Sequence, residues 1–226
     1  MRPHVVVSET LAAPGIGPAG LAWDGETLWH ADYRAGRIFG LDPRDGSARR
    51  SLYCPGNLSG LAWDGRALWQ SLFDQEMIRC VNTNTNDFDE TIILSGQGWL
   101  SGVAWDGRRL WVVAQQVGKL LSIDLDTNGI NSPISAPIAM GDIDFRHGYL
   151  WASIAVPMRF DDVLGRFDWL SDSPEFAVVQ LDPADGRIVS RFAAEYLYSG
   201  LCWVEDALYL SHSESRSIVR THLEGG

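Results

Sequence analysis

The chain is a series of short hydrophobic runs separated by small polar turns. Residues 21–23 and 28–29 flank Asp24-Gly25, a dipeptide that accepts the positive φ angles of a tight hairpin turn. A third run, residues 37–41, ends at a turn that has Pro43 and Gly46 at fitting positions. The runs are rich in aromatic and β-branched residues, and turns interrupt them too often for helices. The pattern therefore predicts an all-β protein.

The same pattern recurs along the chain. Residues 20–29 read GLAWDGETLW, residues 60–69 read GLAWDGRALW, residues 102–111 read GVAWDGRRLW, and weaker copies begin at residues 141 and 200. Three of the four intervals are about 40 residues long, and the fourth is longer because of an insertion near residues 156–175. Each copy accounts for four short antiparallel strands, an arrangement typical of one β-propeller blade.

Five copies predict a five-bladed β-propeller in a single domain, residues 1–226, with blade cores that start near residues 20, 60, 102, 141 and 200. The last copy ends before its fourth strand, whereas residues 5–11 form an unassigned strand before the first copy. We expect this N-terminal strand to complete the last blade, which closes the ring and leaves no open edge there.

Eight of the ten tryptophans occupy two positions of the repeat. Because they recur from blade to blade, we interpret them as packing residues between blades rather than as platforms for a ligand. Trp99 and Trp169 are the two exceptions. The cysteines, Cys54, Cys80 and Cys202, are widely spaced without a CxxC pair and are interpreted as small core residues.

The GLAWDG…LW…D pattern, followed by LDP…G, resembles the superfamily of NHL-type and gluconolactonase-like propellers. It is also similar to virginiamycin B lyase and to the glutaminyl cyclotransferases, a group with five-bladed members. The resemblance spans nearly the whole chain and implies the propeller fold. Two departures concern the site: a full set of gluconolactonase-type acidic metal ligands is missing, and no glutamate of the cyclotransferase type precedes a first strand. The residues that precede the five strand-initial glycines are Ala19, Ser59, Ser101, Met140 and Ser199. No catalytic residue is therefore carried over from a family.

Candidate catalytic residues lie where the second strand of a blade ends. In a propeller, the loops that enter first strands and those that leave second strands share one end of the central channel, here called the top. His30 and Asp32 end one second strand, and His212 ends that of the blade expected beside it. Two histidines and a carboxylate suit acid–base catalysis near neutral pH, or one divalent metal ion. The alternative is that Asp32 caps a turn and that both histidines are ordinary hydrogen-bonded residues.

The same end supplies candidate substrate-binding residues: Trp99, Gln70, Gln115, Trp169, Phe160, Glu195 and Tyr198. Phe160 and Trp169 belong to the insertion, which is interpreted either as a lid or as an interface with a partner. Asp142 and Asp144 replace repeat residues in the fourth copy. Paired carboxylates suit acid–base chemistry, but a degenerate turn is the interpretation that we favour for these two.

Charge and composition narrow the functions further. The chain has 18 Lys and Arg against 29 Asp and Glu, a net charge of -11, which excludes a broad attraction to nucleic acid or to an anionic membrane. No apolar run approaches the length of a membrane span, and the N-terminal apolar run is too short for a secretory signal. The three widely spaced cysteines favour a reducing compartment, so we expect a cytoplasmic location. Motifs for nucleotides or redox cofactors are missing.

We therefore expect a non-redox enzyme for a small molecule, of the lyase, hydrolase or cyclising transferase type. A ligand-binding propeller, lectin-like or a sensor, and a protein-interaction scaffold are the alternatives.

Overall fold

The computed structural model describes residues 2–131, 133–137, 139–156, 158–161, 166–170 and 172–225, and these residues form strands and turns. None of them belongs to a helix long and apolar enough to cross a bilayer. Three sheets follow one another along the chain. The first unit is β2 (Pro18–Trp23), β3 (Leu28–Asp32), β4 (Arg37–Leu41) and β5 (Ala48–Tyr53). The second is β6 (Leu58–Trp63), β7 (Leu68–Leu72), β8 (Met77–Val81) and β9 (Phe88–Ile93). The third is β10 (Leu100–Trp105), β11 (Arg109–Ala114), β12 (Lys119–Asp124), β13 (Gly129–Ile130) and β14 (Ile134–Ser135).

The rest of the described chain forms an eight-stranded sheet and one hairpin. Half of the sheet, the fourth unit, is β15 (Met140–Arg146), β16 (Tyr149–Val156), β19 (Glu175–Leu181) and β20 (Ile188–Ala194). The other half, the fifth unit, is β21 (Gly200–Val204), β22 (Ala207–His212), β23 (Ser217–Glu224) and β1 (His4–Ala12). The insertion forms the hairpin of β17 (Met158–Asp161) and β18 (Arg166–Trp169).

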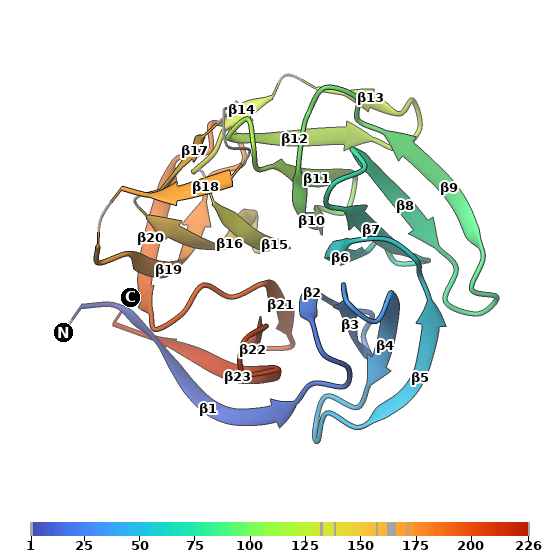
Figure 1. Cartoon of the computed structure of the whole chain (residues 1–226), viewed down its shortest axis with the longest axis horizontal. Helices are drawn as coiled ribbons and strands as arrows, with labels where there is room; N and C mark the ends of the chain where they lie inside the picture. Colours follow the sequence, from blue (N-terminus) through green and yellow to red (C-terminus); the bar gives the residue numbers. More distant parts are fainter. Residues whose placement is uncertain are drawn as a thin grey trace.

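The N-terminal strand lies beside the C-terminal one, as the repeat predicted. β1 pairs antiparallel with β23 from His4 opposite Glu224 to Ala12 opposite Ser217. β1 also meets β20 through one parallel residue pair, His4 and Ala193. The pairing of β1 with β23 therefore joins the two ends of the chain, and the units lie around a common centre (Figure 1).

The inner strands of the units pack against one another in a closed ring, β2 on β6, β6 on β10, β10 on β15, β15 on β21 and β21 on β2. Glycines permit this approach. A Cβ atom on Gly60 would lie 2.5 Å from the Val103 nitrogen and 2.6 Å from the Ser101 carbonyl oxygen, both on the next inner strand. Gly20, Gly102 and Gly200 face neighbouring backbone in the same way. The channel is therefore narrow at the level of these residues.

Asp142 takes the place of a ring glycine in the fourth unit. Ile143 pairs with Ala152 as Val103 pairs with Val112, so the residue before Ile143 corresponds to Gly102. The backbone nitrogen of Asp142 faces the hydroxyl of Ser153, just as Gly60 donates to Ser71. Comparison of the repeats in the sequence places Gly141 at this position instead. The interpretation of Asp142 and Asp144 as a turn is wrong. Both lie within β15, and the turn follows at residues 147–148.

The Asp-Gly hairpins of the first three units hold three of the recurrent tryptophans. The Asp24 carboxylate accepts the indole N–H of Trp29 at 2.7 Å, and Asp64 and Asp106 bind Trp69 and Trp111 at 2.8 Å each. The same carboxylates accept backbone N–H groups of their own turns. These tryptophans are buried, so each aspartate satisfies a donor that water does not reach. Packing is thus their role, as the repetition indicated.

Replacing Asp64 with alanine should lower the free energy of unfolding by about 2 kcal/mol, because the Trp69 indole and the turn lose one shared acceptor. Equilibrium unfolding in urea measures the difference. Asp74→Ala, at an exposed position, is the matched control and should change stability by less than about 0.5 kcal/mol. Equal effects of the two variants would contradict a structural role for the carboxylate.

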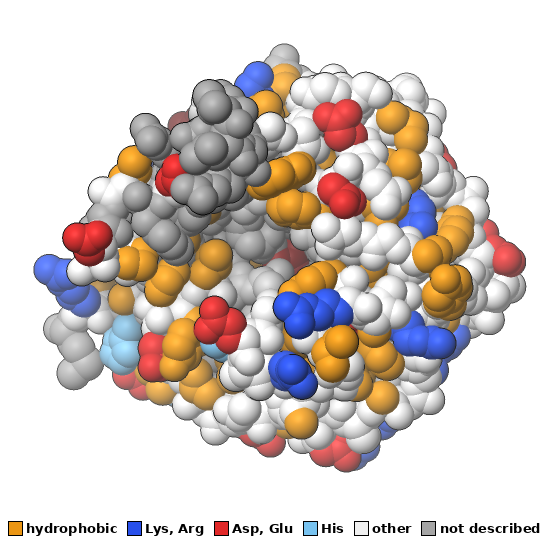
Figure 2. Space-filling view, viewed as in Figure 1, with side chains coloured by type: hydrophobic (Ala, Val, Ile, Leu, Met, Phe, Trp, Pro, Cys, Tyr) orange, Lys and Arg blue, Asp and Glu red, His pale blue; other side chains and the backbone are white. Residues whose placement is uncertain are grey.

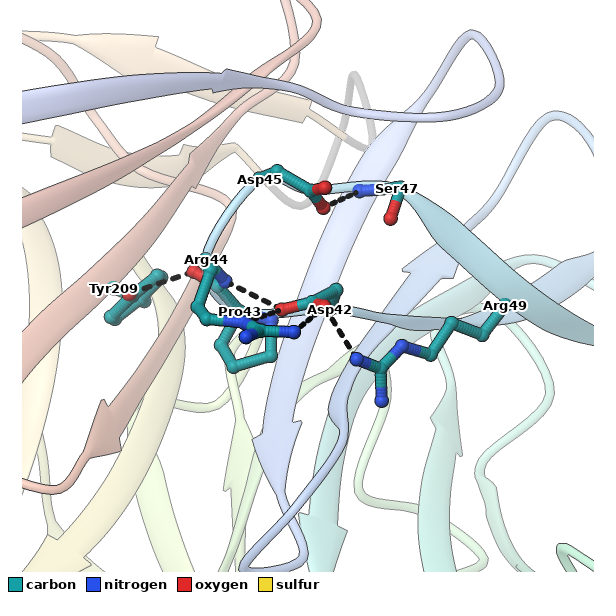
Figure 3. Close-up of polar contacts among 7 residues, drawn as sticks. All are labelled: Asp42, Pro43, Arg44, Asp45, Ser47, Arg49 and Tyr209. Atoms are coloured by element: carbon teal, nitrogen blue, oxygen red, sulfur yellow. Dashed lines mark hydrogen bonds and ion pairs between the residues drawn. The ribbon is translucent and has the colours of Figure 1, made fainter.

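A second kind of turn links neighbouring units on the outside (Figure 3). Asp42 accepts hydrogen bonds from the backbone and guanidinium of Arg44 and pairs with Arg49. These interactions, with Arg44 foremost, hold the pKa of Asp42 well below its usual range. The Tyr209 hydroxyl donates to the Pro43 carbonyl at 3.1 Å, which joins the fifth unit to the first.

The apolar core lies between units, and the three cysteines are buried in it. Burial raises the pKa of each thiol.

Candidate functional site

A cavity of about 600 Å³ opens at the predicted top end, where loops enter inner strands and leave second strands. Its floor includes Ala19, Ser59, Ser101, Gly141 and Ser199, each one residue before a ring position. Among the described residues, five aromatic side chains line its wall: Tyr33, Phe73, Phe176, Tyr196 and Tyr198. Figure 2 shows a face of the molecule on which hydrophobic side chains gather around the centre, with single acidic and basic groups near them.

Several wall residues share one position in the repeat, of which the sequence analysis named only Gln115 as a site residue. Tyr33, Phe73, Gln115 and Ser213 each come four residues after the aromatic residue of a second strand. The first three donate their backbone N–H to Gly17, Asn57 and Trp99, respectively, three residues before a ring position. This hydrogen bond fixes the end of the strand at the cavity. Writing the repeats one above another would have shown this position.

His212 is the predicted catalytic residue that lies on the cavity wall. It is 9% exposed, and its ring stacks on Tyr196 at a centroid distance of 4.5 Å. Its Nδ1 lies 2.7 Å from the Ser215 hydroxyl, which in turn lies 2.7 Å from the Ser217 hydroxyl. Among the described residues no hydrogen bond engages Nε2. The imidazole is thus fixed on one side and has its second nitrogen available for a ligand.

His30 and Asp32 do not join His212. His30 is fully buried, its Nε2 lies 3.2 Å from the Pro14 carbonyl oxygen, and it stacks on Phe39. Burial lowers its pKa to about 4, so the imidazole is neutral at neutral pH. Side chains on alternate faces of a strand explain the separation. His30 faces the fifth unit, whereas His212 follows Leu210 on the face of β22 that packs toward the fourth unit.

Asp32 caps the loop that enters β2. Its carboxylate accepts four backbone N–H groups, those of Ile16, Gly17, Arg34 and Ala35, at 2.6 to 2.9 Å. Burial alone would raise the pKa of Asp32, but these hydrogen bonds outweigh it and lower that pKa. The structural alternative therefore describes Asp32, and the predicted metal set of His30, Asp32 and His212 is wrong. No other group of three His, Cys, Asp or Glu side chains suited to a metal ion occurs among the described residues.

The predicted substrate-binding residues divide into two groups. Gln115 and Tyr198 line the cavity, and Trp99 supports it by packing its ring on Phe73 at 5.1 Å. Gln70 is fully buried and accepts a hydrogen bond from Arg79, which also binds the Pro55 carbonyl, so Gln70 helps to hold an entrance loop.

Glu195 lies beside the cavity rather than in it. It accepts the Tyr196 hydroxyl at 2.7 Å and lines a neighbouring groove that shares Phe176 with the cavity. Phe160 and Trp169 belong to the hairpin of β17 and β18, and their side chains lie outside the described part of the structure.

Most polar groups at the floor already have partners. The Ser101 hydroxyl and the Gln115 amide both donate to the Met140 carbonyl, and Ser199 and Ser213 both donate to the Pro18 carbonyl. These hydrogen bonds hold the four side chains in fixed orientations at the floor. Among the described lining residues, the aromatic faces, the His212 ring, the Glu214 carboxylate, the Asn57 amide and the Ser59 hydroxyl remain for a ligand.

Asp142 lies directly below this floor. It is fully buried, and one carboxylate oxygen accepts the N–H groups of Leu21 and Leu201 at 3.1 and 3.2 Å, while the other has no partner among the described residues. Burial raises its pKa well above the usual value. Asp144 lies further down, beside a smaller cavity at the opposite end, and burial raises its pKa to about 6.

Comparison with known proteins supports the architecture. No family model and no curated protein matches the sequence. Among solved structures, glutaminyl cyclase from Myxococcus xanthus superposes with a TM-score of 0.78 at 14% identity over 98% of this chain and 97% of that chain. Virginiamycin B lyase from Staphylococcus aureus gives 0.55 at 11% identity over 97% and 99%. Hydrazine synthase from Kuenenia stuttgartiensis gives 0.55 at 16% identity over 91% of this chain and 58% of that chain.

This protein has a propeller fold. This is the fold that the repeat pattern predicted. Sequence identities of 14% and 11% establish the fold alone. Within the propeller, the single carboxylate on the described cavity wall comes from Glu214, after a second strand, and not from a residue that precedes a first strand.

Proposed function

We propose that this protein is a five-bladed propeller enzyme that acts on a small molecule in the top cavity without redox chemistry. The blade count treats the halves of the eight-stranded sheet as separate blades, because the single pair of His4 and Ala193 joins them. The observation that carries the enzymatic proposal is His212. It is held in the aromatic wall by Ser215, with its second nitrogen available.

In this proposal His212 is the acid–base group. An imidazole accepts or donates a proton near neutral pH, and a fixed ring orientation makes such transfer efficient. The Ser215 hydroxyl positions the ring, and stacking on Tyr196 restricts its rotation. The aromatic wall excludes water from the reacting atoms. Elimination, hydrolysis and intramolecular cyclisation all need such a proton transfer.

The first experiment tests cyclisation and elimination, the reaction classes in the names of two structurally similar proteins. Purified protein is incubated with glutaminyl peptides and with virginiamycin B, and products are detected by mass spectrometry. Once turnover is found, His212→Asn should lower kcat by about 100-fold or more. Asparagine can still bind Ser215, so the cavity should keep its shape.

His222→Ala is the matched control, because His222 is exposed on β23 away from the cavity wall. It should retain full activity. An H212N enzyme that turns over at the rate of the unchanged protein would remove His212 from the chemistry and overturn the mechanism.

A second candidate function is ligand binding without chemistry, in a lectin-like or sensor role. The satisfied hydrogen bonds of Ser101, Ser199 and Gln115 favour it, since they leave few polar groups for catalysis. Under this alternative a molecule binds in the cavity at a stoichiometry near one and is recovered unchanged. The scaffold alternative predicts instead that deletion of the insertion abolishes partner binding.

A further inference from the structure

The wall of the top cavity has a distinctive charge composition. Of the described residues that line it, Glu214 is acidic and none is Lys or Arg. The nearest basic group in sequence to the wall is Arg34, which donates its Nε to the Tyr33 hydroxyl at 3.0 Å and lies over that ring. Arg34 is thus engaged with a wall residue and is not itself on the wall.

The faces of the aromatic rings add to the negative charge that Glu214 brings to the wall. The face of an aromatic ring carries negative charge density and attracts cations. Tyr196, which is 41% exposed, presents its ring beside His212 and lies edge-on to Tyr198. Its hydroxyl donates to Glu195, which brings a second carboxylate next to the cavity. One carboxylate, that of Glu214, therefore lines the cavity together with a group of aromatic rings, and a second, that of Glu195, lies just outside it.

From this arrangement we infer that the cavity selects organic cations, in which an alkylammonium group is joined to an apolar body. The ammonium lies against Tyr196 and pairs with Glu214, while the apolar part packs on Phe73 and Phe176. Amines that keep N–H groups and quaternary amines both satisfy this arrangement, because attraction to a ring face needs no hydrogen bond. The inference shares its cavity with the proposed function but concerns binding, so it holds or fails independently of turnover.

The test uses two molecules of the same shape. Choline carries a quaternary ammonium group, and 3,3-dimethylbutan-1-ol has a neutral carbon in the place of that nitrogen. Isothermal titration calorimetry with the full chain should show that choline binds about tenfold more tightly than the alcohol. The acid 3,3-dimethylbutanoate should bind more weakly than either.

Variants assign the preference to named groups. Glu214→Gln and Tyr196→Leu should each lower the affinity for choline more than the affinity for the alcohol, and so reduce the preference for choline. The controls are Glu26→Gln, at an exposed turn, and Tyr53→Leu, at a ring that is 59% exposed on β5, and both should retain the full preference.

Equal affinity for the two probes, tighter binding of the acid, or no detectable choline binding would each overturn the inference. H212N supplies the distinction from the proposed function. A protein that prefers choline but shows no His212-dependent turnover supports the cation site and contradicts the enzyme. A protein that shows His212-dependent turnover but no preference for choline supports the enzyme and contradicts the cation site.

Discussion

Substitution of Gly60 with alanine should cost about 3 kcal/mol of folding free energy, at the upper end of the range for overpacking. The new methyl group would lie 2.5 Å from the Val103 nitrogen and 2.6 Å from the Ser101 carbonyl oxygen. Both atoms belong to the backbone of the neighbouring inner strand, which is held by its own sheet and by the next unit. No side-chain rotation relieves this contact, so the ring must expand.

Equilibrium unfolding in urea measures the loss. Gly129→Ala is the matched control, because the nearest atom to its added Cβ is the Thr127 hydroxyl oxygen at 3.0 Å, on an exposed side chain that can turn away. This control should change stability by less than about 1 kcal/mol. If Gly60→Ala were as mild as Gly129→Ala, close packing of the inner strands would not be what requires glycine there.

Substitution of Asp142 with asparagine should stabilise the protein at alkaline pH and have little effect at acidic pH. Burial raises the folded-state pKa of Asp142 above its unfolded value near 4, so the fold prefers the protonated carboxyl. Its contribution to stability is complete below the unfolded pKa and is lost as the pH rises through the folded pKa. Asparagine keeps an oxygen for the N–H groups of Leu21 and Leu201 and carries no charge at any pH.

Unfolding free energies at pH 4.5, 6, 7.5 and 8.5 test this expectation. The gain from Asp142→Asn should grow with pH by about 1.4 kcal/mol for each unit between the unfolded and folded pKa values. Asp144→Asn is the comparison, since the pKa of Asp144 is raised only to about 6 and its gain should stop growing above that pH. A D142N protein less stable than the unchanged one at pH 8.5 would mean that the backbone amides favour the charged carboxylate.

The local pattern of the sequence was sufficient to predict the strands and the end of the channel that carries the cavity. Asp24-Gly25 and its repeats predicted hairpins, and residues 5–11 predicted the pairing of β1 with β23. His212 and Gln115 were predicted as site residues because they lie where second strands end, and Tyr198 because it lies in a loop at the top; all three line the cavity. These features depend on neighbours in the chain, and a repeated sequence shows them several times.

His30 and Gln70 lie away from the cavity for one shared reason. His30 and Gln70 follow the second-strand tryptophan directly and point into the space between units, where they hold loops at Pro14 and Pro55. Cavity residues such as Tyr33 and Phe73 come three positions later, where the strand has ended. Alternation along one strand gives the face of the sheet, but not how deep along the channel a side chain lies.

By itself the sequence determined the all-β architecture, the order of the strands and the closing of the ring by its N-terminal strand, because hairpin turns and strand runs are local. The tertiary structure alone decided that Asp142 occupies a ring position, that His30 and His212 face different neighbours, and that Glu214 lines the same cavity as the aromatic residues. Each of these depends on the one-residue register of a strand and on which unit packs against which face. Such contacts join residues far apart in the chain, and only packing around the common axis brings them together.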